Sequence, residues 1–149
     1  MSDGYNHAQA RTPEQARQMK DLAARKVCAF CPENILTETR TPIDMETDHW
    51  FVKENDYPYK DTKLHLLLIP KEHAKSVADL SAKAQTDFID VVVQVEKHYN
   101  LTSYAVAMRS GDPRYNGGSV EHLHAHIIVG DKTSAEPVRF KVYSPPKAT

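Results

Sequence analysis

Two stretches of the chain carry the apolar periodicity of helices. After the polar residues 1–11, residues 12–14 supply a threonine N-cap, a first-turn proline and a first-turn acid. The helix that they begin is expected to run to about Lys26. A second helix is predicted over 81–99, because its apolar side chains recur every three or four residues and Ser81 can cap its first turn.

Shorter apolar runs predict strands. They cover residues 49–55, 64–70, 102–109 and 119–129, with weaker candidates inside 34–48 and at 138–143. The turn-rich loop between the two strongest late strands indicates that these strands form a hairpin. The predicted fold class is therefore α+β, an antiparallel β-sheet of about five strands with the long helix packed on it.

Length and composition narrow the classes of function. The chain has 149 residues, a formal charge of −1 and 40% hydrophobic residues, which suits one domain with a buried core. The near-neutral charge excludes a uniformly basic surface for nucleic acid or anionic membrane. No apolar run approaches the roughly 20 residues that cross a bilayer, and no signal peptide is recognisable. We expect a cytoplasmic protein with one domain over 12–143, a flexible N-terminus at 1–11 and a flexible tail at 144–149.

Three histidines alternate with apolar residues late in the chain. His122, His124 and His126 are separated by Leu123 and Ala125, a pattern that this composition produces by chance roughly 0.02 times. In a strand, such spacing places the three imidazoles on one face and the apolar side chains on the other. Two chemistries fit this face. The imidazoles could hold a metal, or one could be a nucleophile beside two phosphate ligands.

The loop before the histidines favours the phosphate alternative. It ends in Asn116, Gly117, Gly118 and Ser119. Paired glycines let backbone N–H groups turn toward an anion, and Arg109 adds positive charge at the same end of the hairpin. A phosphate ester fits this surface better than a neutral substrate does.

The cysteines form a single pair, Cys28 and Cys31, so the chain has no disulfide framework. Their C-x-x-C spacing is that of a metal half-site or of a redox pair. A thioredoxin-like redox motif belongs at a strand-to-helix junction, whereas this pair follows a predicted helix. Metal binding is therefore favoured over a redox pair or free reduced thiols.

Taken together, these motifs resemble the histidine triad family. HLHAHII at 122–128 is similar to the family motif His-φ-His-φ-His-φ-φ, in which φ is apolar, and GGSVEHLHAH is similar to the run that contains it. NDYPYKDTKLHLLLIPKEH at 55–73 resembles the family segment that ends in Pro-Lys-x-His. CAFC is similar to the Cys-x-x-Cys of the zinc-containing bacterial branch. Order and spacing agree over about 27–130.

The resemblance implies a hydrolase or transferase that acts at the α-phosphate of a purine nucleotide, either a dinucleoside polyphosphate or a nucleoside phosphoramidate. His124 would be the nucleophile, with its Nδ1–H bonded to a backbone carbonyl, and would form a nucleotidyl intermediate. His126 would bind the α-phosphate oxygens, and Ser119 would assist the leaving group. His65 would support the triad, and Asn55 would hold the ribose. Transfer to phosphate instead of water would make the protein a phosphorylase.

The resemblance also implies further ligands and a partner. The nucleotide's phosphates would meet Arg109 and the loop residues Asn116, Gly117 and Gly118. A structural zinc would be held by the ligand set Cys28, Cys31, His73 and His122. A homodimer would form through the helix 81–99 and the hairpin.

Three features depart from the family pattern. Arg109 stands where many members carry Asn, Gly118 stands where Gln often precedes the serine, and the loop between them contains an unusual DPRYN. These departures support one alternative, a nucleotide-binding regulatory module with little turnover. A second alternative is a zinc metallohydrolase that uses the three triad histidines as ligands, although the sequence offers no obvious carboxylate to complete that site. An aprataxin-like enzyme acting on adenylylated DNA fits less well, because the chain is neutral.

Overall fold

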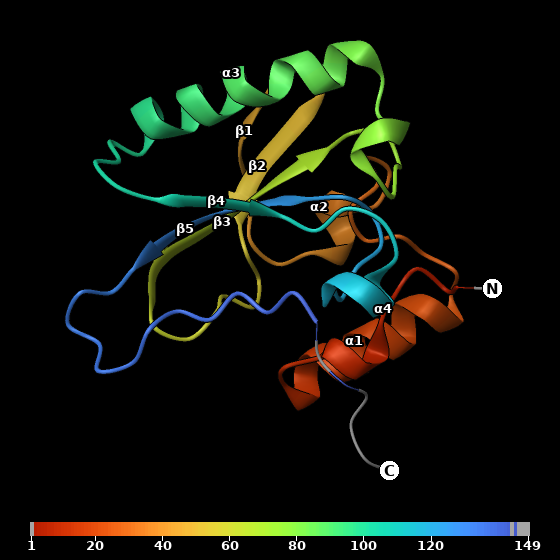
Figure 1. The fold of residues 1–149 in the computed structure, drawn as a ribbon. Coiled ribbons are helices and arrows are strands. Elements are labelled where there is room, and N and C mark those ends of the chain that lie inside the picture. The colour runs from red at the N-terminus through yellow and green to blue at the C-terminus, as the bar shows by residue number, and fades with distance from the viewer. Residues whose placement is uncertain (1, 144, 146–149) are drawn as a thin grey trace.

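A five-stranded antiparallel sheet forms the centre of the computed structural model, which describes residues 2–143 and 145 (Figure 1). The strands are β1 (Ile43–Glu46), β2 (Trp50–Glu54), β3 (Thr62–Pro70), β4 (Ala105–Met108) and β5 (Ala125–Gly130). Their order across the sheet is β1-β2-β3-β5-β4, and all neighbours are antiparallel. The predicted α+β fold with about five strands is confirmed.

The long helix α3 (Ala82–His98) covers one face of the sheet (Figure 1). Ser81 caps it as predicted, since its side chain accepts a hydrogen bond from the Ala84 backbone. The apolar stripe of α3 packs on the side chains of β3 that point toward it, Leu66 and Leu68. This packing holds a helix whose β-branched residues lower its intrinsic propensity.

The opposite face of the sheet is covered by α1 (Pro13–Ala24), which Thr12 caps through the Gln15 backbone at 3.0 Å. Leu67 and Ile69 belong to the core cluster on this side. Because successive strand residues point to opposite faces, the continuous apolar run of β3 supplies both cores. The helix ends two residues before the predicted boundary.

Two predicted strands differ from the structure. The run 119–129 is a strand only from Ala125 onward, where the pairing of β5 with both β3 and β4 begins. The backbone of Leu123 instead donates to the Ala74 carbonyl at 2.8 Å. The prediction of a strand at 138–143 is wrong. This segment pairs with no strand and runs beside the cavity described below.

The remaining elements are short. They are η1 (His7–Gln9), α2 (Ile35–Glu38), η2 (Val77–Asp79) and α4 (Pro113–Asn116). The last lies inside the loop that the sequence indicates as a turn, and the Asp112 side chain caps it. Among the residues that the structure describes, no helix is long and apolar enough to cross a membrane.

The N-terminal segment lies against the body of the domain. The Tyr5 hydroxyl donates to the Val27 carbonyl at 2.8 Å, and the Asn6 backbone donates to the Ser119 carbonyl at 2.8 Å. That residues 1–11 are flexible is a statement about motion and stays a prediction. The predicted tail 144–149 lies outside the described residues except for Pro145.

Candidate active site

The three alternating histidines serve two different places. His126 lies in β5, whereas His122 and His124 precede the strand. The predicted alternation nevertheless holds, because Leu123, Ala125 and Ile127 belong to the core under α3, whereas His122 and His124 both contact Phe30 on the opposite side. His122 turns toward the two cysteines, and His124 and His126 line a cavity beside it. The triad therefore divides between a cluster of metal-ligand type and an open site.

The cluster joins three distant segments. Its members are Cys28, Cys31, His73 and His122, whose ligand atoms all lie within 4.8 Å of one another. Two sulfurs and two imidazole nitrogens match the donor set of a closed, tetrahedral structural zinc site. His122 also donates from Nε2 to the Pro70 carbonyl at 2.8 Å, the kind of second bond that orients a ligating imidazole. The residues therefore fit a zinc ion.

The redox alternative for the cysteines finds no support in their surroundings. Burial, followed by the neighbouring Cys28, raises the pKa of the Cys31 thiol to about 12. A reactive redox cysteine needs the opposite, a lowered pKa and access to solvent. A bound metal would remove the thiol protons, as ligation requires.

His124 is held as a neutral imidazole. Its Nδ1 lies 2.9 Å from the His122 carbonyl, which can only accept, so Nδ1 carries the proton and Nε2 keeps its lone pair. Burial lowers the pKa of His124 to about 4, and the charges of Arg109 and Arg11 contribute. The side chain packs edge-on against Phe30. Near pH 7 this imidazole is therefore neutral, with a lone pair on Nε2.

His126 has the opposite tautomer, as a chain of hydrogen bonds demonstrates. The Tyr59 backbone N–H donates to His65 Nδ1 at 3.1 Å, so His65 carries its proton on Nε2. His65 Nε2 then donates to His126 Nδ1 at 2.8 Å, which leaves the His126 proton on Nε2. That Nε2 is buried and has no hydrogen-bond partner among the described residues. It is a donor prepared for a ligand.

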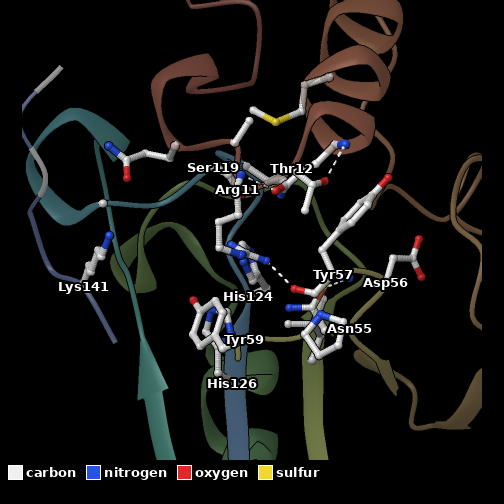
Figure 2. A pocket seen from close by; sticks show the side chains of 18 of the residues that line it. Arg11, Thr12, Asn55, Asp56, Tyr57, Tyr59, Ser119, His124, His126 and Lys141 are labelled. Carbon is white, nitrogen blue, oxygen red and sulfur yellow. Dashed lines mark hydrogen bonds between the residues drawn. The ribbon is translucent and has the colours of Figure 1, made fainter. Parts of the chain in front are cut away.

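A cavity of about 1060 Å³ opens beside these two imidazoles (Figure 2). Of the predicted nucleotide-binding residues, it brings together Asn55, Arg109, Gly117 and Ser119. It lies between α1 and the N-terminal segment on one side and the loop from β2 to β3 on the other.

Three other predicted residues, Asn116, Gly118 and His65, support the cavity without lining it, and Gly117 both lines it and shapes the turn. Asn116 donates to the Ser110 carbonyl, and its Oδ1 accepts from the Gly118 backbone at 3.0 Å, so both residues shape the turn. Gly117 has φ +79°, and a Cβ there would come within 2.8 Å of the Lys141 carbonyl. His65 lies behind His126 and fixes its tautomer.

Several cavity residues were not predicted from the sequence. Tyr59 stacks on His126 with a centroid distance of 5.6 Å, and Phe140 meets the same imidazole edge-on at 5.5 Å. Arg11 reaches in from the segment before α1 (Figure 2). No sequence signal brings Arg11 or Phe140 to the histidines, because neither lies in one of the motifs. The position of Tyr59 in the motif-bearing segment 55–73 could have predicted its place at the site.

Comparison with known proteins gives the family. Residues 38–133, more than half of the chain, match the family model described as the HIT domain. The chain belongs to the HIT family. The resemblance seen in the sequence is thereby confirmed.

Individual proteins are similar to this HIT protein over parts of their sequence or in their fold. It is 37% identical over 67 residues to adenosine 5'-monophosphoramidase hnt1 of Schizosaccharomyces pombe. The match spans 45% of this chain and 49%, about half, of that relative. A solved histidine triad protein from Clostridium difficile is 26% identical with a TM-score of 0.55, over 74% of this chain and 96% of the other.

A further solved structure shares the fold of this HIT protein. It is a Zn-bound histidine triad family protein from Mycobacterium smegmatis. That protein is 18% identical with a TM-score of 0.57, over 79% of this chain and 83% of the other.

Proposed function

We propose that this HIT protein is a hydrolase or transferase that cleaves purine nucleotides at the α-phosphate through a nucleotidyl-His124 intermediate. One observation carries the proposal. Two neighbouring imidazoles in one cavity have opposite tautomers, a lone pair on His124 Nε2 and a proton on His126 Nε2. A nucleophile beside a hydrogen-bond donor is the pairing that displacement at phosphorus requires.

In the first step, His124 Nε2 forms a bond to the α-phosphorus. The bond from phosphorus to the leaving group breaks, and its electron pair departs with that group. His126 Nε2–H donates to a non-bridging oxygen, where negative charge grows. Ser119 lines the cavity and would donate its hydroxyl proton toward the leaving atom.

In the second step, water attacks the phosphorus and the bond to His124 breaks. The imidazole returns to its neutral form, and the water proton is released. The lowered pKa of His124 favours both steps, because a neutral imidazole attacks more readily than a protonated one and is regenerated on departure. Transfer to phosphate in place of water would make the same site a phosphorylase.

The substrate assignment draws on the relative and on the cavity. The relative from S. pombe is named as an adenosine 5'-monophosphoramidase, which supports nucleotides as the substrate class. Asn55 lines the cavity at the β2–β3 loop, where we assign it to the ribose hydroxyls.

A structural zinc at Cys28, Cys31, His73 and His122 completes the proposal. The four donors support it, and a bound ion would link the turn after α1 to the segments after β3 and before β5. The alternative of a catalytic metal held by all three triad histidines loses its support. His122 faces the cysteines, and His126 Nδ1 is occupied by His65.

A homodimer remains part of the proposal. Ile89 and Val93 on α3 and Val106 on the edge strand β4 are exposed apolar side chains. Such side chains on an edge strand and its neighbouring helix support a two-fold interface. Size-exclusion chromatography with light scattering tests it, and a monomer would contradict it.

The test of the function is turnover of an adenosine phosphoramidate and of a diadenosine polyphosphate by the wild type, His124→Ala and His98→Ala. His98 is an exposed histidine at the end of α3 and serves as the matched control. We expect turnover of at least one substrate by the wild type and by His98→Ala, and its loss in His124→Ala. Nucleotide binding without turnover in the wild type would favour the regulatory module instead.

A further inference from the structure

Two arginines meet at Tyr59 on the rim of the cavity. The guanidinium carbon of Arg11 lies 4.7 Å from the ring centroid of Tyr59, and that of Arg109 lies 5.9 Å from the same centroid. Arg109 Nη1 also donates to the Tyr59 hydroxyl at 2.8 Å. Both arginines line the cavity that contains His124 and His126, and Figure 2 shows Arg11 pointing into it above Tyr59.

Both guanidinium groups have uncharged hydrogen-bond partners. Arg11 donates to the Tyr57 carbonyl. Arg109 donates from Nε and Nη2 to the Lys141 carbonyl at 3.0 and 2.7 Å. Within the described part of the chain, no carboxylate forms an ion pair with either arginine. Since a guanidinium offers five N–H donors, both groups keep donors for a ligand.

The acidic residues that line the same cavity are engaged elsewhere. Asp56 pairs with the buried Lys53 at 3.1 Å, and Glu136 lies 3.9 Å from Arg139. Asp61 accepts a hydrogen bond from a serine hydroxyl. Among the residues that the structure describes, the two cations beside the histidines therefore have no carboxylate counter-ion.

The positive charge reaches the reaction centre. Burial is the main cause of the lowered pKa of His124 and of His126, and the charges of Arg11 and Arg109 both add to it. Two like charges held close together repel each other, and a bound anion would relieve that repulsion. The α-phosphate already has a donor in His126. The two arginine cations are therefore available for a second phosphate.

We propose that Arg11 and Arg109 form a second anion subsite, which binds a phosphate group of the leaving chain and makes this protein select phosphate over amine leaving groups. The proposal rests on the proposed function and deepens it. Arg109 lies within the matched residues 38–133 and Arg11 lies outside them, so the HIT domain match by itself does not bring the two arginines together.

The subsite has a defined role in the reaction. As His124 Nε2 bonds to the α-phosphorus, the bond to the bridging oxygen breaks, and its electron pair remains on the departing phosphate. The two guanidinium groups stabilise that negative charge without proton transfer. A leaving amine carries no such charge and gains nothing from them.

The test compares the binding of AMP and of α,β-methylene-ADP by calorimetry. The second nucleotide adds one phosphate through a linkage that cannot be cleaved at the bridging position. We expect the wild type to bind it about tenfold more tightly than AMP, which is the size of one charge-assisted hydrogen bond. Arg11→Gln and Arg109→Gln should each lose most of this preference, because each should weaken the binding of α,β-methylene-ADP more than that of AMP.

Matched variants separate charge from folding. Arg114→Gln is the control, because Arg114 is exposed, pairs with Asp112 and lies outside the cavity lining. It should keep the tenfold preference. Arg11→Lys keeps the charge and should retain part of it, whereas a variant that had merely lost its fold would lose AMP binding as well.

Two results overturn the subsite. One is equal binding of the two nucleotides by the wild type, and the other is an unchanged preference in both glutamine variants. Neither result touches the proposed function, because turnover through His124 would continue. Failure of the proposed function differs, since wild-type protein would then release no product from either substrate.

Discussion

The metal-type cluster and the cavity are neighbours that share one histidine motif. They differ in whether their polar side-chain atoms have partners within the protein. In the cluster, His122 has partners on both ring nitrogens, and the two sulfurs face the two imidazoles. In the cavity, His124 Nε2 and His126 Nε2 have no described hydrogen bond. Mutual satisfaction is what a structural site needs, whereas buried polar atoms without partners point to a ligand.

The largest expected effect is a loss of turnover on substitution of a cavity residue, with the metal-type cluster left intact. His124→Ala removes the nucleophile, so turnover should fall by about 10⁴-fold or more, while metal content stays unchanged. Single-turnover kinetics and elemental analysis of the same preparation measure both quantities. Loss of metal in this variant would mean that the two regions are not separate.

The next largest effect is a loss of zinc and of thermal stability on substitution of a cluster residue, with the imidazoles of the cavity left in place. Cys31→Ser removes one of the four donors, so the purified protein should contain no tightly bound zinc. A metal present at 1,000 times its Kd stabilises a fold by about 4 kcal/mol, which lowers Tm by about 10 °C when it is lost. Calorimetry with and without a chelator measures this. A wild-type Tm that does not change on addition of the chelator would contradict a structural role for the zinc ion.

A smaller effect sharpens the role of His65 as a positioning residue. His65→Ala frees His126 to adopt either tautomer, so kcat should fall about tenfold while KM changes little. His65→Gln restores a donor toward His126 and should recover part of kcat, which a purely structural role would not predict. A kcat of His65→Gln equal to that of His65→Ala would count against tautomer control.

The smallest effect concerns the wall of the cavity. Burial opposes ionisation of Asp56, but the backbone N–H groups of Thr41 and Arg40 and the charge of Lys53 outweigh it, so the pKa of Asp56 is lowered. A lowered folded-state pKa gives stability that is present above the unfolded value near 3.9 and lost as pH falls below it.

Urea unfolding at pH 7 and at pH 3 measures this contribution. Asp56→Asn should lose about 1 kcal/mol at pH 7 and less at pH 3, which flattens the profile. Asp90→Asn, at an exposed position on α3, is the control and should follow the wild type. An unchanged profile in Asp56→Asn would show that the pair does not stabilise this wall.

Periodicity and motif spacing predicted most of the fold. Helix α3 and its Ser81 cap agree with the pattern, and β3 follows from its apolar run, because local propensity and packing favour the same structure there. The prediction of a strand at 138–143 was wrong for a physical reason. An apolar-polar alternation forms a strand only where a neighbour can pair with it, and this segment has none.

The site was predicted in its members and only partly in its geometry. The family resemblance named His122 as a metal ligand and His124 as the nucleophile. The expected alternation of imidazoles and apolar side chains holds, because Leu123, Ala125 and Ile127 lie in the core under α3, although the strand itself begins only at Ala125. Arg11 could not be foreseen, because it reaches the histidines only through the packing of α1 on the sheet.

Native mass spectrometry of the protein, taken shortly after mixing with a diadenosine polyphosphate, tests the division of the triad most directly. The spectrum reports bound metal and a covalent nucleotide on the same molecule. We predict one zinc ion per chain together with a nucleotidyl adduct that maps to His124 and is absent from His124→Ala. Metal-bound wild-type protein that turns over substrate without ever carrying an adduct, or an adduct that maps to His122, would contradict the account.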